Sequence, residues 1–153
     1  MKEAIIRTPK EIYDRLGEDI VLIPLRSGKD GKRPQDKNWT RITIEETRKA
    51  EYVSKLCAVQ NIGVVLGGNS NGLCTVDIDH DELVEPFMDS NPQMRHTFIT
   101  KGKRGANFWF RAINDVPRTK KIEGVGELRG TGASSRSANF DGYRHVRRPR
   151  NDF

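Results

Sequence analysis

The chain has 153 residues, of which 35% are apolar and 31% are charged, a length and composition that suit one domain with a hydrophobic core. It has neither a hydrophobic signal region nor an apolar run long enough to span a bilayer, which excludes a membrane protein and predicts a soluble, cytoplasmic one. The net charge of +6 is uneven, because residues 100–153 carry 13 Lys/Arg against 5 Asp/Glu, and this basic half indicates either a nucleic-acid or nucleotide partner or a solvated basic surface.

The N-terminal segment predicts one short helix and one strand. Thr8-Pro9-Lys10-Glu11 combines an N-cap hydroxyl, a proline in the first helical position and the acid of a capping box. The helix is expected to run from about Pro9 to Leu16 and to stop at Gly17. The apolar run Ile20–Leu25 that follows predicts a buried strand.

A polar loop and a second helix come next. Residues 26–38 are rich in Gly, Lys and Asp, and we expect Trp39 to anchor this loop on the core. Thr43-Ile44-Glu45-Glu46 is a second capping box, which predicts one helix that extends to about Leu56. Both cysteines lack metal-ligand spacing and are expected to be reduced, buried thiols: Cys57 and Cys74.

The centre of the chain predicts a β-hairpin followed by a helix. Ile62–Leu66 and Leu73–Asp77 are apolar runs typical of strands, and the Gly/Asn-rich turn Gly67–Gly72 between them suits a hairpin. Asp81 is expected to cap a helix of roughly Glu82–Met88, because its carboxylate can accept hydrogen bonds from the first free N–H groups of a helix.

The second half predicts three further strands. Thr97–Thr100 and Phe108–Phe110 form a strand pair around the basic loop Lys101–Asn107, and Val125–Arg129 is expected to be the last strand. Helices thus alternate with strands that are mostly joined as hairpins. This order predicts an α+β fold in which flanking helices cover a mostly antiparallel sheet.

The sharpest chemical signal is the acidic sequence Val76-Asp77-Ile78-Asp79-His80-Asp81 at the end of a predicted strand. Side chains two residues apart share one face of a strand, so Asp77 and Asp79 are expected to project together. Two crowded carboxylates repel each other unless a cation lies between them, and hard oxygen ligands suit Mg²⁺ or Mn²⁺. Metal-assisted phosphoryl transfer needs such a pair, although acids that mark a strand end and cap the next helix give the same pattern.

Two more segments could carry binding residues. Lys101-Gly102-Lys103-Arg104-Gly105-Ala106-Asn107 places three cations among glycines, whose backbone can approach a phosphate closely. Gly126-Glu127-Leu128-Arg129-Gly130 puts an acid and an arginine on one face of a predicted strand. Each pattern alone also fits a simpler role, a charged hairpin loop for the first and a surface ion pair for the second.

The order of these segments resembles the N-terminal domain of the bifunctional primase-polymerase family, which is archaeo-eukaryotic primase-like and is carried by phages, prophages and plasmids. An acid pair after a strand, a basic glycine loop before an aromatic strand, and then an acid-x-Arg sequence occur in that order. The resemblance covers about residues 20–132, and its earlier motifs are Lys32-Arg33-Pro34, Trp39 and Asn61–Gly67.

The resemblance implies a compact sheet related to RNA-recognition-motif folds, in which three carboxylates hold two divalent metal ions, Mg²⁺ or Mn²⁺. Carried over by position, the catalytic and metal-binding residues are Asp77, Asp79 and Glu127. The residues that contact the incoming triphosphate are Lys103, Arg104, Asn107 and Arg129. Asn107 stands where the family commonly has a histidine, so positive charge at the triphosphate rests more on Lys103 and Arg104.

The implied function is a metal-dependent nucleotidyl transferase, a DNA primase/polymerase that uses nucleoside triphosphates and a single-stranded DNA template in phage or mobile-element replication. A helicase is the expected further partner, and nucleic-acid contacts are expected at Lys101, Arg144, Arg147 and Arg148. One alternative is a catalytically silent, truncated primase remnant that binds nucleic acid. A metal-dependent nuclease is less favoured, because no histidine pair or tyrosine nucleophile lies near the acids.

The sequence after Gly132 departs from the family pattern. We expect a primase-polymerase-like domain over residues 1–132 and a basic, poorly ordered tail over residues 133–153. The apolar alternation of a closing strand is lost there, which predicts a truncated or frameshifted end that leaves the sheet edge and the nucleotide site open. Codons that permit Ser134–Asp141 can, in a shifted frame, encode a strand-like stretch followed by two prolines.

Overall fold

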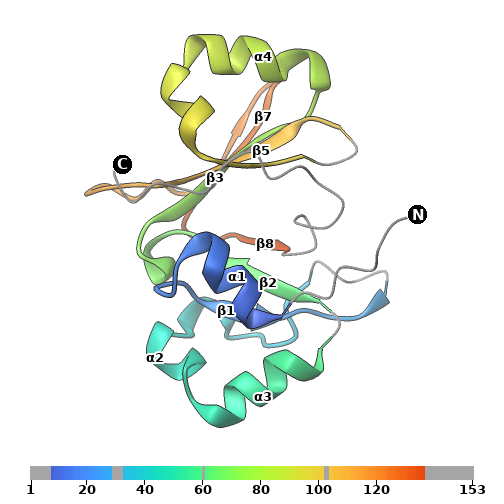
Figure 1. The fold of residues 1–153 in the computed structure, drawn as a ribbon, viewed down its shortest axis with the longest axis vertical. Coiled ribbons are helices and arrows are strands. Elements are labelled where there is room, and N and C mark those ends of the chain that lie inside the picture. Colours follow the sequence, from blue (N-terminus) through green and yellow to red (C-terminus); the bar gives the residue numbers. More distant parts are fainter. Residues whose placement is uncertain (1–7, 29–32, 60, 102–103, 137–153) are drawn as a thin grey trace.

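The computed structural model of the chain describes residues 8–28, 33–59, 61–101 and 104–136. Within these ranges it has the α+β architecture that the sequence predicts, with four α-helices and two antiparallel sheets (Figure 1). No helix in the described ranges combines the length and apolar surface needed to pass through a bilayer. The helices are α1 (Pro9–Leu16), α2 (Ile44–Thr47), α3 (Ala50–Ala58) and α4 (Asp81–Ser90).

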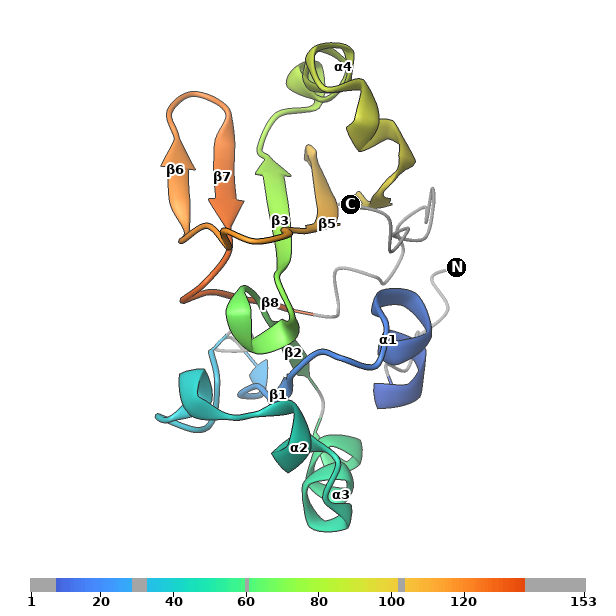
Figure 2. The ribbon, with the colours of Figure 1, turned by 90° about the vertical axis from the view of Figure 1, so that its left-hand side faces the viewer.

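The two sheets occupy different halves of the molecule (Figure 1, Figure 2). The smaller sheet has the strand order β1 (Leu22–Pro24), β2 (Ile62–Val65), β8 (Ser134–Arg136). The larger sheet has the strand order β4 (Phe98–Thr100), β5 (Ala106–Arg111), β3 (Leu73–Ile78), β7 (Gly126–Arg129), β6 (Lys120–Ile122). The described chain also has short 3-10 segments at η2 (Trp39–Arg41), η3 (Gly68–Ser70) and η4 (Pro92–His96).

Helix α4 covers one face of the five-stranded sheet (Figure 2). Successive side chains of a strand point to opposite faces, and Val76, Ile78 and Phe108 point toward α4, where they are buried. The ring centroid of Phe87 on α4 lies 4.9 Å from that of Phe108. The opposite face of the sheet, which carries the odd-numbered residues of β3, is therefore not covered by α4.

An apolar cluster joins the two sheets along part of that opposite face. It contains Ile12 and Leu16 from α1, Leu22 from the smaller sheet, and Leu73 and Trp109 from the larger sheet. Each of these side chains is at most 3% exposed. Their burial removes a large apolar area from water, which is the main favourable term in holding the two sheets together.

Helix α1 forms as the sequence predicts. The Thr8 hydroxyl accepts a hydrogen bond from the N–H of Glu11 at 3.3 Å, and the helix ends at Leu16, directly before Gly17.

The prediction that both cysteines are reduced and buried is correct only in part. Both are free and Cys74 is buried, but Cys57 is exposed, because the core side of α3 is taken by its neighbour Leu56.

The single helix predicted after Thr43 is two helices, α2 and α3. Thr43 does cap α2, but the Thr47 hydroxyl donates to a carbonyl one turn earlier at 2.6 Å, in competition with the helical backbone bonds. Lys49 then takes an extended conformation with ψ 138°, which breaks the helix. After the break, the hydroxyl of Tyr52 on α3 donates to the carbonyl oxygen of Leu22 at 2.6 Å and fixes α3 on the smaller sheet.

The predicted hairpin between residues 62 and 77 does not form, because β2 and β3 belong to different sheets. β2 pairs with β1 and β8, whereas β3 pairs with β5 and β7. In the turn between them, the buried hydroxyl of Ser70 accepts a hydrogen bond from the N–H of Val21 at 2.8 Å. This long-range contact fixes the point where the chain crosses from one sheet to the other.

Strands β6 and β8 were not among the predicted elements. β6 is exposed at every position and has a single apolar residue, Ile122, so it lacks the apolar alternation that marks a strand. β8 lies in the segment predicted as a tail, but its backbone pairs with β2, and Ala133 before it is 7% exposed in the core. Strand pairing needs backbone groups rather than apolar side chains, which explains the difference. The rest of the predicted tail, residues 137–153, lies outside the described residues.

Arg111 of β5 links the larger sheet to the end of α1. Its guanidinium donates to the Asp19 carboxylate at 2.9 Å and to the carbonyl oxygen of Leu16 at 3.0 Å. Leu16 is the last residue of α1, where a carbonyl has no partner within the helix and a cation is favoured by the helix dipole. Arg111 therefore ties the end of α1 to a strand of the five-stranded sheet.

We predict that Arg111→Ala lowers the free energy of unfolding by about 1–3 kcal/mol, because it removes two hydrogen bonds that involve a charged group. Urea unfolding followed by circular dichroism measures the change. Arg26→Ala, at an exposed position of the same charge, is the control and should change stability by less than about 0.5 kcal/mol. Equal effects of the two substitutions would show that the Arg111 contacts do not hold α1.

Candidate active site

A row of polar side chains crosses the five-stranded sheet near the end of β3. Strand pairing places Asp77 directly opposite Asn107 of β5 on one side and Glu127 of β7 on the other. The same register extends the row to Thr100 of β4 and Lys121 of β6. Directly opposed residues share a face and have Cβ atoms about 4.5–5.5 Å apart. The polar row thus gathers two carboxylates, an amide and an ammonium group on the face away from α4.

The environment of this face changes along β3. Leu73 is 1% exposed within the cluster that joins the sheets, and Thr75 is fully buried. The side chain of Asp77, one step further along the same face, is 20% exposed. Asp77 therefore lies where the apolar cover ends, close enough to solvent for a ligand to reach its carboxylate.

The carboxylate of Asp77 has two polar partners. The Thr75 hydroxyl donates to it at 3.0 Å, and the Arg129 guanidinium lies 3.7 Å away. Burial raises the pKa of Asp77 above its ordinary value, and the nearby carboxylates of Glu127 and Asp79 raise it further, against the lowering effects of Arg129 and Thr75. The negative charge is thus under-compensated, and a further cation would stabilise it.

Arg129 connects the polar row to the smaller sheet. One of its terminal nitrogens faces Asp77, and the other donates to the carbonyl oxygen of Ser134 in β8 at 2.6 Å. Its Nε is buried without a hydrogen-bond partner among the described residues. Arg129 therefore spans the junction of the two sheets.

Two glycines allow other backbone segments to approach the end of β3. A Cβ atom on Gly126 would overlap the carbonyl oxygen of Asp77, and one on Gly105 would overlap the carbonyl oxygen of Ile78. Any side chain at either position would push β7 or the start of β5 away from β3. These glycines thus permit the close packing on which the polar row depends.

Asp81 has a different partner from the one the sequence predicts. Helix α4 does begin at Asp81, but the cap residue is His80, which makes no side-chain cap bond. The Asp81 carboxylate instead accepts a hydrogen bond from the backbone N–H of Gly105 at 2.8 Å. The prediction that Asp81 caps the helix is therefore wrong, because a long-range partner occupies the carboxylate.

The other predicted site residues lie around the row or outside the described residues. Asp79 follows the end of β3 and is exposed, with its backbone N–H donating to the carbonyl oxygen of Val125 at 2.9 Å. Lys101 and Arg104 are exposed at either end of the basic loop. In the described ranges, no three His, Cys, Asp or Glu side chains are grouped so as to hold a metal ion. The predicted residues outside those ranges are Lys103, Arg144, Arg147 and Arg148.

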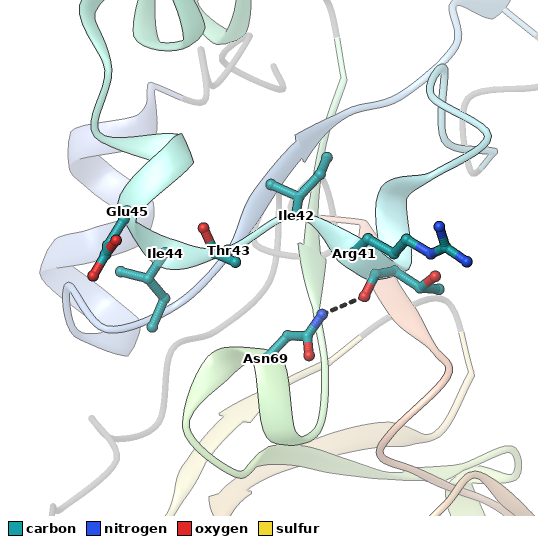
Figure 3. Close-up of a pocket in the computed structure, with 7 residues that line it drawn as sticks. Arg41, Ile42, Thr43, Ile44, Glu45 and Asn69 are labelled. Atoms are coloured by element: carbon teal, nitrogen blue, oxygen red, sulfur yellow. Dashed lines mark hydrogen bonds between the residues drawn. The ribbon is translucent and has the colours of Figure 1, made fainter.

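An open hollow of about 410 Å³ lies away from the polar row (Figure 3). It is lined by residues 40–45 and by Asn69, whose side-chain amide donates to the carbonyl oxygen of Thr40 at 2.5 Å. None of the carboxylates in the row lines it. We place the candidate site at the row, because there, among the described residues, a partly buried carboxylate of raised pKa, Asp77, lies beside hydrogen-bond donors and a second acid.

Comparison with known families gives one match that covers most of the chain. The model of the bifunctional DNA primase/polymerase N-terminal domain, Prim-Pol, matches residues 14–145. The chain belongs to this family. The resemblance inferred from the motif order is thereby confirmed, and membership supports a primase/polymerase type of function with nucleotide and DNA substrates. Comparison with curated proteins gives no match.

Three residues near the polar row are not indicated by the sequence as site residues. Thr75 precedes Asp77 by two residues, so the alternation that pairs the acids could have revealed it. Lys121 lies opposite Glu127, but β6 has no sequence signal from which that register could be read. The sequence indicates Asp81 only as a helix cap, because its bond to Gly105 depends on how the basic loop folds back.

We predict that Asp77→Asn stabilises the Prim-Pol domain at neutral pH, because it removes a carboxylate that burial disfavours in the charged form. The folded protein binds this proton more tightly than the unfolded chain does, since the pKa of Asp77 is raised. The wild type therefore gains stability as pH falls through that raised pKa, and the variant lacks this gain.

Urea unfolding at about pH 7 and about pH 4 tests the direction of this pH dependence, because ordinary carboxyl pKa values lie near the lower pH. The advantage of Asp77→Asn should be present at neutral pH and shrink on acidification. Asp115→Asn, at an exposed position, is the control. A variant that is less stable than the wild type at neutral pH would show that Arg129 and Thr75 outweigh the burial of Asp77.

Proposed function

We propose that the chain is a metal-dependent nucleotidyl transferase, a DNA primase/polymerase whose site is the polar row. The observation that supports this most directly is the register that sets Asp77 between Asn107 and Glu127, with Asp79 just beyond the strand. These side chains combine acidic oxygen ligands with a hydrogen-bonding amide. They lie in a chain that belongs to a primase/polymerase family.

The row offers carboxylate oxygens, the type of donor that Mg²⁺ and Mn²⁺ prefer. Asp77 and Glu127 offer oxygen ligands from neighbouring strands, and Asp79 is close enough to raise the pKa of Asp77. We propose these three as the metal-binding and catalytic residues. A bound divalent ion would neutralise triphosphate charge and activate the attacking hydroxyl. The excess negative charge at Asp77 is the physical reason that such an ion would be held there.

The residues around the acids suit a triphosphate. Arg104 is exposed on the basic loop next to β5, and Asn107 is half-buried beside Asp77. The Arg129 side chain is 28% exposed beside Asp77, so its guanidinium can also contact an anion bound at the row. We propose that Arg104, Asn107 and Arg129, with Lys103 of the same loop, orient the triphosphate. Lys101 and the basic residues Arg144, Arg147 and Arg148 would contact the single-stranded DNA template.

The proposed setting is replication of a phage or another mobile element in the cytoplasm, with a helicase as partner. The support is the motif order, which resembles that of the primase-polymerases carried by phages and plasmids. In this role the chain would build or extend a primer on DNA that a helicase has separated.

A second candidate is a nucleic-acid-binding module without catalysis. It is favoured by the ion pair between Arg129 and Asp77, because a protein cation there satisfies part of the charge that a metal ion would need. Among the described side chains, no three His, Cys, Asp or Glu are grouped as metal ligands, and this also favours a binding module without catalysis. The two functions differ in whether divalent ions bind at the row and support nucleotide incorporation.

We predict that Mn²⁺ raises the melting temperature of the wild type through ligand linkage, and that Asp77→Asn with Asp79→Asn abolishes this rise. The same double variant should lose Mn²⁺-dependent incorporation of labelled nucleotide on a single-stranded template. Asp115→Ala with Glu123→Ala removes two exposed acids elsewhere and is the control. An unchanged Mn²⁺ effect in the double variant would contradict the site, whereas Mn²⁺ binding without incorporation would favour the silent module.

We predict that Arg104→Ala weakens triphosphate binding by about 1–3 kcal/mol, because it removes a charge-assisted contact. Isothermal titration calorimetry with a non-hydrolysable nucleoside triphosphate in Mn²⁺ measures the affinity. Lys55→Ala, on α3 beneath the other sheet, removes the same charge at an exposed position and should leave the affinity unchanged. Equal losses for both variants would indicate a diffuse basic surface rather than a site.

A further inference from the structure

Asp81, the first residue of α4, holds the end of the basic loop beside the acidic segment that follows β3. Its carboxylate accepts the Gly105 N–H at 2.8 Å, a contact between residues 24 positions apart. An acid in the first turn of a helix ordinarily serves the free N–H groups of that helix. In α4 the cap makes no side-chain hydrogen bond, and Asp81 is turned toward the loop instead.

Gly105 lies directly against the backbone of the acidic segment. Its φ is +69°, and a Cβ atom there would overlap the carbonyl oxygen of Ile78 and lie 3.1 Å from the carbonyl carbon of Asp79. Gly105 is the residue before β5, and Arg104 precedes it immediately. The hydrogen bond to Asp81 therefore fixes the loop backbone directly after Arg104, at the point where it passes the backbone of the proposed metal ligand Asp79.

We propose that Asp81 is a positioning residue for the incoming nucleoside triphosphate, which it serves by fixing Gly105 and thereby Arg104 beside Asp79. This inference rests on the proposed function, because it assigns Arg104 to the triphosphate. Asp81 acts through its hydrogen-bond acceptor and touches neither the metal ion nor the substrate. A neutral acceptor of the same shape should therefore replace it.

The chemistry distinguishes this role from two others. A metal ligand needs the negative charge, so Asp81→Asn would be as harmful as Asp81→Ala. A residue that only complements the helix dipole would also need the charge, and its neighbour Glu82 in the same turn would contribute similarly. If Asp81 instead acts as a positioning acceptor, Asp81→Asn retains function and Asp81→Ala does not.

The test compares Asp81→Ala, Asp81→Asn and the control Glu82→Ala. Binding of a non-hydrolysable nucleoside triphosphate in Mn²⁺ is measured by calorimetry, and hydrogen exchange of the Gly105 amide is measured by NMR. Asp81→Ala should weaken triphosphate binding about tenfold and lose the protection of the Gly105 amide, because a hydrogen bond to a charged group is broken. Asp81→Asn and Glu82→Ala should stay within about twofold of the wild type in affinity.

In an active chain, the same comparison should place the Asp81→Ala effect in KM for the nucleotide, with kcat little changed. Loss of Gly105 protection with unchanged triphosphate affinity would overturn the positioning role and leave the proposed function intact. A deficit in Asp81→Asn equal to that in Asp81→Ala would overturn it in favour of a charge-dependent role. A wild type that binds no triphosphate would overturn both proposals, and Gly105 protection would then report only a structural contact.

Discussion

The pairing of β3 with β5 and β7 is the constraint on which the site depends. In this register Val76 and Ile78 pack under α4, and Asp77 faces the other way between Asn107 and Glu127. A slip of one residue would bring Asp77 into the apolar layer under α4 and expose both aliphatic side chains. The packing that stabilises the sheet therefore also determines which polar groups meet, so the core and the site are specified together.

That arrangement places a carboxylate where the fold does not favour it. Asp77 is largely buried beside two other acids, and its pKa is raised despite the contacts with Thr75 and Arg129. A neutral side chain at this position would make the folded protein more stable. A partly buried, under-compensated charge of this kind is typical of sites that trade stability for binding or chemistry.

The sequence predicted those features that depend on neighbouring residues. Capping and alternation located α1 and placed Asp77 and Glu127 on strands, and the motif order identified the family. Two of the errors arose where a distant contact decides the outcome. The Ser70 hydroxyl accepts a hydrogen bond from the N–H of Val21 in the turn between β2 and β3, which belong to separate sheets. The Asp81 carboxylate accepts a hydrogen bond from the N–H of Gly105 and does not cap α4. β6 and β8 escaped prediction because their pairing relies on backbone groups.

The position of β8 in the chain sets an order of assembly during synthesis. All strands of the five-stranded sheet precede β8, so that sheet and its polar row can close while the second edge of β2 is still unpaired. An unpaired edge is a template for association with other chains, and it persists until β8 leaves the ribosome. The carbonyl oxygen of Ser134 reaches Arg129 only with the arrival of β8, so the junction between the sheets is the last described part of the molecule to be completed.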